Sequence, residues 1–310
     1  MTPATAVTAR EERTESSGGI NLFIRTWQPN GRPRAVMVIC HGFNSHSGYY
    51  AQVGEQLAGQ GFAVYALDLR GRGQSDGERY YVNAMSDLVN DVAVVVTLAK
   101  SRLPGLPTFL LGHSAGGVVS CLYSIEHQQD LSGLICESFA FEVPAPGFAI
   151  AALKGLSHLA PHAHVLRLKN EDFSRDPSIV QAMNEDPLIA HETQPTHTIA
   201  ELARADDRLK QEFALITLPI LILHGTADRA AKPSGSQHFY DAAGSTDKTL
   251  KLYDGYYHDL LNDVGREGVL ADIVQWTEAR LVSTEARSPR FAAMPAADMV
   301  VIEGARERAR

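Results

Sequence analysis

The sequence predicts an α/β fold with a mostly parallel central sheet, flanking helices and an inserted helical cap. Short apolar runs alternate with helical stretches along most of the 310-residue chain. Continuous apolar runs are typical of strands buried on both faces, as in a parallel sheet covered by helices. One long proline-punctuated segment interrupts this alternation with short helical patterns, which indicates an insert.

The alternation of strand and helix is regular enough to assign each element. The predicted strands are 21–27, 35–40, 62–68, 108–112, 131–138, 219–225 and 249–254. The helical stretches between or after them are about 49–60, 83–103, 115–128, 233–243 and 265–282. Such alternation predicts a layered α/β architecture.

The interruption divides the predicted core into two parts. Residues 1–143 form the first part of the core, and we expect residues 1–19 to be flexible. Residues 144–217 form the helical cap, because a structureless loop of that length is implausible in a compact domain. Residues 218–282 complete the core, and residues 283–310 are expected to form a weakly ordered tail.

Composition excludes several classes of protein. A net charge of −8 and a pI near 5.8 argue against nucleic-acid binding, which usually shows a basic patch. The three cysteines all lie in apolar runs, which favours buried thiols in a reducing compartment and a cytoplasmic location. No secretory h-region and no run of 18 apolar residues is visible, so neither export nor a membrane span is expected. The oligomeric state is not predicted.

The stretch "GHSAG", residues 112–116, carries the main functional signal. It follows a predicted strand and opens a predicted helix, which is the context that a G-x-S-x-G nucleophile elbow requires. Ser114 would present its hydroxyl above the sheet. The backbone N–H of Ala115, at the positive end of the helix, would point to where an acyl oxyanion forms.

A nucleophilic serine needs a base, and the base needs an orienting acid. The fold order Ser, acid, His is met by Ser114, Asp228 and His258, each placed just after a predicted strand. Glu137, at the end of the strand before the cap, is the rival acid.

The loop "HGFNSHSGYY", residues 41–50, follows the predicted strand 35–40 and should supply the second oxyanion donor. The turn at His41 and Gly42 would direct the N–H of Phe43 toward the site. A simple turn without a catalytic role is the alternative.

In combination, these motifs resemble the monoacylglycerol lipase branch of the α/β-hydrolases. The matching stretches are "HGFNSHSGYY", "DLRGRGQSDGER", "LPGLPTFLLGHSAGG", "NEDPLI", "LILHGTADRAAKPSGS" and "DKTLKLYDGYYHDLL", which cover most of residues 20–282. The resemblance implies an α/β-hydrolase fold and hydrolysis of a small-molecule carboxylic ester, with neither a metal nor an organic cofactor. It also implies that the insert is a lid over an apolar acyl tunnel.

The chain departs from this family at three positions that surround the glycerol exit. Ser45, Tyr49 and Leu261 stand where the family has glutamate, arginine and histidine. A site built to hydrogen-bond a polyol loses much of its preference when its polar partners are absent. We therefore expect an esterase with broad alcohol tolerance. A dedicated monoacylglycerol lipase or lysophospholipase is the alternative.

The cap stretch 146–160 has an amphipathic pattern that includes Phe148 and Leu153. It is interpreted either as a helix packed on the core or as a lid helix that lines the acyl tunnel or transiently touches lipid. Phe148 and Leu153 are accordingly candidate substrate-binding residues. Two further functions stay open: a thioesterase or perhydrolase with the same triad, and a non-catalytic ligand receptor, although receptors on this scaffold usually have a damaged triad.

Overall fold

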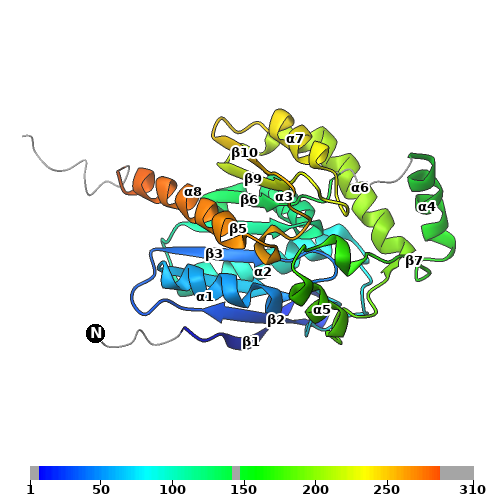
Figure 1. Ribbon diagram of the computed structural model, residues 1–310, viewed down its shortest axis with the longest axis horizontal. Coiled ribbons are helices and arrows are strands. Elements are labelled where there is room, and N and C mark those ends of the chain that lie inside the picture. The colour runs from blue at the N-terminus through cyan, green and yellow to red at the C-terminus, as the bar shows by residue number, and fades with distance from the viewer. Residues whose placement is uncertain (1–6, 142–146, 287–310) are drawn as a thin grey trace, which may run out of the picture.

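An eight-stranded sheet in the order β1-β2-β4-β3-β5-β6-β9-β10 forms the centre of the structure (Figure 1). The computed structural model describes residues 7–141 and 147–286. The strands of the sheet are β1 (Arg10–Ser16), β2 (Ile20–Trp27), β3 (Ala35–Cys40), β4 (Phe62–Leu67), β5 (Thr108–His113), β6 (Gly133–Glu137), β9 (Ile220–Gly225) and β10 (Lys248–Tyr253).

Six of the strands run parallel to one another. β2 pairs antiparallel with both β1 and β4, whereas the pairs from β4 through β3, β5, β6 and β9 to β10 are all parallel. The carboxyl ends of β3, β5, β6, β9 and β10 therefore meet at one edge of the sheet. Functional groups in open α/β sheets lie beyond this edge.

Helices cover both faces of the sheet (Figure 1). The core helices are α1 (Ala51–Gly59), α2 (Met85–Arg102), α3 (Ala115–His127), α7 (Pro233–Ala242) and α8 (Arg266–Ala286). α1 and α8 pack on one face, and α2, α3 and α7 pack on the other. None of the described helices is long and apolar enough to cross a membrane.

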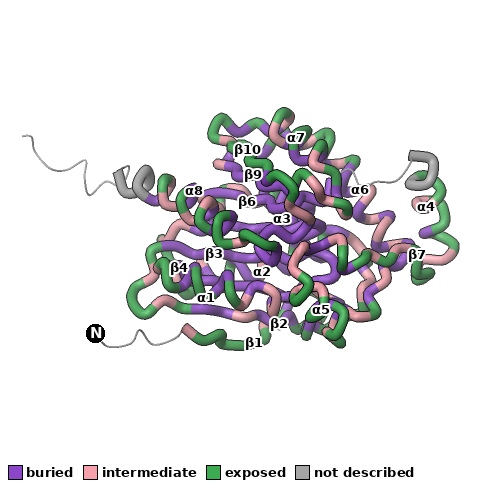
Figure 2. Tube along the Cα trace, viewed as in Figure 1, coloured by how far each residue is buried: buried purple, intermediate pink, exposed green. Residues whose placement is uncertain are grey.

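Strands buried on both faces explain the continuous apolar runs of the sequence. In β3, Val36 and Val38 contribute to the core beneath α2 and α3, whereas Met37 and Ile39 contribute to the core beneath α1 and α8. Figure 2 shows the central strands of the sheet buried and the edge strand β1 largely exposed. The mostly parallel sheet predicted from these runs is confirmed.

The predicted cap region lies between β6 and β9. Its described elements include the helices α4 (Gly147–Leu159), α5 (Pro177–Glu185) and α6 (Thr196–Glu212). The sequence showed no strand here, but β7 (His164–Leu166) and β8 (Gln194–Pro195) form a small antiparallel pair. Strands this short carry no period-2 signal, so only the approach of distant segments creates them.

The expectation that residues 1–19 are flexible is wrong for residues 10–19. Residues 10–16 form the edge strand β1, which pairs with β2 along its whole length. Its sequence, REERTES, lacks an apolar face because the strand is largely exposed, and charged residues are common on sheet edges. α8 likewise continues through residues 283–286, which we assigned to the tail. Residues 287–310 lie outside the described part of the chain.

Candidate active site

Ser114 occupies a strained turn between β5 and α3. Its backbone angles are φ 55° and ψ −122°, a conformation that costs a non-glycine residue on the order of 1–3 kcal/mol. Two hydrogen bonds hold this turn in place: Ser114 N donates to Glu137 O at 2.9 Å, and Ala140 N donates to Ser114 O at 3.3 Å. The turn therefore has the geometry of a nucleophile elbow.

Glycines surround Ser114 because the backbone packs too closely for side chains. A Cβ at Gly116 would lie 2.3 Å from Cys40 O and 2.4 Å from His41 O. A Cβ at Gly42 would lie 2.6 Å from the Cβ of Ser114. These contacts bring the loop after β3 against the elbow.

Ser114, His258 and Asp228 form an unbroken hydrogen-bonded relay. His258 Nε2 lies 2.8 Å from Ser114 Oγ, and His258 Nδ1 lies 2.7 Å from Asp228 Oδ2. A carboxylate only accepts hydrogen bonds, so the His258 proton belongs on Nδ1 and the Nε2 lone pair faces the serine hydroxyl. This arrangement allows His258 to act as a general base toward Ser114.

Asp228 stays ionised in this relay. Burial favours its neutral form, but the pKa of Asp228 is still lowered, because His258 and His224 outweigh the effect of burial. His224 Nε2 lies 3.0 Å from Oδ2, and Oδ1 accepts hydrogen bonds from the backbone of Ala230 at 2.8 Å and Ala231 at 2.9 Å. The carboxylate is thus held on both oxygens.

The loop after β3 is anchored by His41. Its Nδ1 lies 2.6 Å from Gly42 O, and its Nε2 accepts a hydrogen bond from Leu69 N at 3.0 Å. Burial lowers the pKa of His41 to about 4, so the ring is neutral at pH 7 and can make both bonds. Among the described residues, the amides of Phe43 and Ala115 donate to no protein acceptor. These are the two amides that we predict to hold an oxyanion.

Comparison with known proteins identifies the family of this chain. The family model Hydrolase_4, described as serine aminopeptidase, S33, matches residues 31–265. The monoacylglycerol lipase of Mycolicibacterium smegmatis is 33% identical over 276 residues, which cover 88% of this chain and 99% of that protein. The human monoglyceride lipase is 33% identical over 279 residues, covering 88% and 92%. This chain belongs to the monoacylglycerol lipase-like α/β-hydrolases.

Solved structures of the family have the same architecture. The crystal structure of the Paleococcus ferrophilus monoacylglycerol lipase aligns with a TM-score of 0.76 and 29% identity, covering 84% of this chain and 99% of that one. A monoglyceride lipase from Saccharomyces cerevisiae aligns with a TM-score of 0.78 at 22% identity, a likeness that concerns the fold alone.

Among the described residues, no hydrogen bond or ion pair joins Glu137, the rival acid, to His258. Glu137 is fully buried, and its Oε1 accepts a hydrogen bond from Leu261 N at 3.3 Å. Burial and the nearby Asp259 raise the pKa of Glu137 well above its usual range, which keeps the group neutral. His113 also lies behind the relay, with its ring 5.0 Å from that of His258.

The group formed by His113, Glu137 and Asp259 could geometrically resemble a metal site. One potential ligand atom from each lies within 4.8 Å of the others. However, Asp259 already accepts from Asn262 Nδ2 at 3.0 Å, and burial raises the pKa of Glu137 well above its usual range, which disfavours the charged carboxylate that would bind a metal. The absence of a metal therefore stays our prediction.

The predicted exit residues are buried or partly buried. Ser45 and Leu261 are each only 2% exposed. Tyr49 lies at the contact between core and insert, where its hydroxyl donates to Asp186 Oδ2 at 3.1 Å. His46 Nε2 lies 2.8 Å from the same oxygen, so Asp186 joins the insert to the loop after β3.

The predicted lid residues lie on α4. Leu153 is partly buried on this helix, which packs on α6. Phe148 belongs to the same helix, but its side chain is outside the described part of the structure. No described contact brings Leu153 to the relay.

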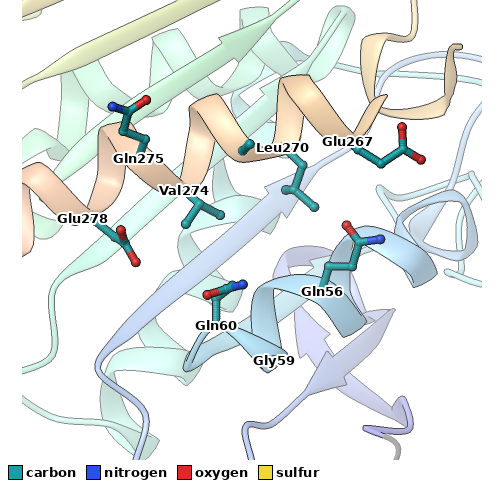
Figure 3. Close-up of a pocket in the computed structure, with 9 residues that line it drawn as sticks. Gln56, Gly59, Gln60, Glu267, Leu270, Val274, Gln275 and Glu278 are labelled. Carbon is teal, nitrogen blue, oxygen red and sulfur yellow. The ribbon is translucent and has the colours of Figure 1, made fainter. Parts of the chain in front are cut away.

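A groove elsewhere on the molecule is separate from this site. Figure 3 shows it between α1 and α8, lined by Gln56 and Gln60 on one side and by Leu270, Val274 and Glu278 on the other. No residue of the relay lines this groove.

Several residues around the relay gave no usable sequence signal. The Arg72 guanidinium stacks 4.4 Å from the centre of the Phe43 ring, and its Nη2 donates to Gln194 Oε1 at 2.7 Å. Phe173 places its ring edge-on to His258, with centroids 5.0 Å apart. Arg72 lies 29 positions from Phe43 and 122 from Gln194, and Phe173 lies 85 positions from His258, so no spacing rule finds these contacts.

Proposed function

We propose that this chain hydrolyses carboxylic esters of apolar acids through a covalent acyl-enzyme on Ser114. The observation that carries the proposal is the Ser114–His258–Asp228 relay, with both hydrogen bonds at catalytic distance, in a chain of a carboxylic ester hydrolase family. Its relatives are named as monoacylglycerol lipases, and their substrates are small-molecule esters.

In the first half-reaction, His258 Nε2 takes the proton of Ser114 as the hydroxyl oxygen attacks the ester carbonyl. The oxyanion is stabilised by the amides of Phe43 and Ala115, the second of which lies at the N-terminus of α3. The His258 imidazolium then gives its proton to the departing alcohol. A water molecule, activated by the same nitrogen, releases the acid and restores Ser114.

Asp228 makes this cycle possible by holding the correct tautomer and stabilising the imidazolium. Its lowered pKa keeps the carboxylate charged while His258 carries the proton. The relay is also shielded from water, since Ser114 is 5% and His258 1% exposed. Shielding strengthens the electrostatic terms that stabilise the transition state.

We further propose that the alcohol is recognised loosely. Leu261 has no polar group and the Tyr49 hydroxyl already donates to Asp186, while Ser45, whose hydroxyl has no hydrogen-bond partner among the described residues, is 2% exposed. A glycerol moiety therefore finds fewer polar partners here than glutamate, arginine and histidine would offer. Each missing hydrogen bond to a polyol hydroxyl is worth about 0.5–1.5 kcal/mol. Over three positions this removes on the order of a ten- to hundredfold preference for glycerol esters.

Exposed leucines on α4 and the buried cysteines support the expected lipid contact and the expected location. Leu156 and Leu159 are exposed on α4, which supports transient contact of the cap with lipid or micelles. Cys40, Cys121 and Cys136 are buried free thiols, which supports a cytoplasmic location. Nucleic acid is not an expected partner.

Ser114→Ala tests the proposed nucleophile. Loss of a triad residue costs on the order of 10⁴–10⁶ in kcat, and labelling by a fluorophosphonate, detected as a mass increase on the intact protein, should disappear. The wild type is the control for labelling, and thermal melting verifies that the variant is folded. A folded Ser114→Ala protein that keeps more than a hundredth of the wild-type rate would contradict the mechanism.

An ester panel tests the alcohol preference. We compare kcat/KM for the glycerol, ethyl and 4-nitrophenyl esters of one fatty acid, together with its thioester and its amide. The proposal expects the oxygen esters to differ by less than about tenfold after allowance for leaving-group pKa. A glycerol preference beyond that indicates a dedicated monoacylglycerol lipase, and preferred cleavage of the thioester or amide indicates a different reaction class.

A further inference from the structure

Residues 168–175, which belong to the insert between β6 and β9, contact two loops at the catalytic edge of the sheet. One is the loop after β3, which carries Phe43, and the other is the loop after β10, which carries His258. We infer that this segment, called the strap below, positions both loops for catalysis, so that the insert completes the active site as well as covering it. The inference rests on the proposed roles of Ser114 and His258.

The strap first fixes the backbone at His258. The carbonyl of Phe173 accepts a hydrogen bond from Asp259 N, the residue after the histidine, at 2.8 Å. The Phe173 ring packs edge-on to the imidazole, with an interplanar angle of 87°. Main chain and ring of one strap residue therefore restrain His258 from two directions.

Asp263 then joins the strap to both ends of the His258 loop. Its buried carboxylate accepts from Tyr257 N at 3.0 Å and Val264 N at 2.8 Å, on either side of the histidine. The same carboxylate accepts from Arg175 N at 2.7 Å and from Arg175 Nε at 2.8 Å. Ser174 Oγ adds a bond to Asn262 O at 2.8 Å. Charge-assisted hydrogen bonds are stronger than hydrogen bonds between neutral groups, and these hold the loop around His258 in one conformation.

Arg175 is itself held in place by the loop that it supports. Its Nη2 donates to Val264 O at 2.6 Å, and its guanidinium lies 4.1 Å from the centre of the Tyr256 ring. The side chain thus makes a charge-assisted hydrogen bond, a hydrogen bond to a backbone carbonyl and a cation–π contact with residues on both sides of His258. It touches none of the proposed reacting atoms, so its role is positioning.

The other end of the strap restrains the oxyanion loop. Asn44 follows Phe43 and has a left-handed backbone with φ 50°. Its side-chain Nδ2 donates to Asn170 Oδ1 at 2.9 Å, and Asn170 Nδ2 in turn donates to Asn184 Oδ1 at 2.9 Å. The turn that presents the Phe43 amide is therefore tied to the same segment that holds His258.

Positioning of the two loops affects the rate because proton transfer in the relay requires hydrogen bonds of 2.7 and 2.8 Å. A displacement of about 1 Å at catalytic groups can cost on the order of a hundredfold in rate. The strap is thus expected to act on kcat, which depends on the relay and the oxyanion amides, and to leave substrate binding nearly unchanged.

The test compares Arg175→Ala with Arg70→Ala, a control variant that breaks a similar buried ion pair away from the relay. Arg70 forms a bidentate pair with Asp91, at 2.8 Å from Nε and 2.6 Å from Nη2, and Asp91 and Asp263 are both fully buried. Arg175→Ala should lower kcat by about 10- to 100-fold, change KM by less than about threefold, and slow fluorophosphonate labelling of Ser114 by the same factor as kcat. Arg70→Ala should lower the melting temperature comparably and leave kcat within twofold of the wild type.

Arg175→Lys and Ser174→Ala are milder variants that keep the test decisive if Arg175→Ala fails to fold. All rates are measured well below the melting temperature of the least stable variant. Each strap variant should lose kcat with KM preserved, in the order Arg175→Ala, Arg175→Lys, Ser174→Ala. Wild-type kcat in folded strap variants, or an equal loss in Arg70→Ala, would overturn the inference. Labelling of Ser114 in the wild type tests the proposed function separately, whatever the strap variants do.

Discussion

Replacing Asp228 by asparagine is a sharp test of the relay, because the surrounding hydrogen bonds decide how the new amide must sit. Asp228 Oδ1 accepts from Ala230 N at 2.8 Å and from Ala231 N at 2.9 Å. An asparagine must keep its carbonyl oxygen there and point its NH₂ group at His258. His258 Nδ1 would then have to accept a hydrogen bond, which moves the ring proton to Nε2.

This tautomer cannot take the proton of Ser114, because Nε2, 2.8 Å from the serine oxygen, no longer has a free lone pair. The equivalent substitution in a serine-protease triad costs about 10⁴ in kcat, which corresponds to about 5.4 kcal/mol of transition-state stabilisation. The fold should survive, since the amide has the shape of the carboxylate. His224 Nε2, 3.0 Å from Oδ2, can accept from the new NH₂ group once its own proton moves to Nδ1, which lies 2.6 Å from Ser236 Oγ.

The assay is steady-state kcat on a 4-nitrophenyl ester, with thermal melting to verify folding. Glu137→Gln is the control. Glutamine resembles the neutral acid that the raised pKa of Glu137 indicates and keeps an acceptor for Leu261 N, so kcat should stay within a few-fold of the wild type. The reasoning fails if folded Asp228→Asn retains more than a tenth of wild-type kcat, or if Glu137→Gln loses more activity than Asp228→Asn.

Three further substitutions test packing, titration and surface contact. Gly116→Ala should lower the free energy of unfolding by about 1–3 kcal/mol or more, because the new Cβ would lie 2.3 and 2.4 Å from backbone oxygens. Gly155→Ala is the control, since its new Cβ would have no atom within 4 Å, and it should be neutral or slightly stabilising. Denaturant unfolding measures both. Burial raises the pKa of Asp259 from 3.8 to about 6, so the folded state binds this proton more tightly and the unfolding free energy falls as pH rises through that range. Asp259→Asn should therefore stabilise the protein by on the order of 2 kcal/mol at pH 8 and by less at pH 5, as measured by denaturant unfolding; an equal gain at both values would argue against the titration. Leu159→Asp should weaken binding to phosphatidylcholine vesicles and leave hydrolysis of a soluble short-chain ester unchanged. Leu215→Asp, at an exposed leucine outside α4, should affect neither. Equal vesicle binding in both variants would contradict lipid contact through α4.

Most of the sheet could be predicted from the sequence because the information is local. β3 is a continuous apolar run, since its alternate residues enter the cores on opposite faces of the sheet. The edge strand β1 could not be predicted in this way, because its charged residues face solvent and only its pairing with β2 makes it a strand. The pair of β7 and β8 is likewise a product of tertiary contact.

The sequence by itself determined the elements of the relay. Ser114, Asp228 and His258 each follow a strand of a parallel sheet, and the carboxyl ends of such strands meet at one edge, so their order along the chain predicts that they come together. The tertiary structure alone decided what holds them there. The pairing of Arg175 with Asp263, and of Asn44 with Asn170, joins residues 88 and 126 positions apart, and no local pattern encodes such contacts because they depend on how the insert folds back over the sheet.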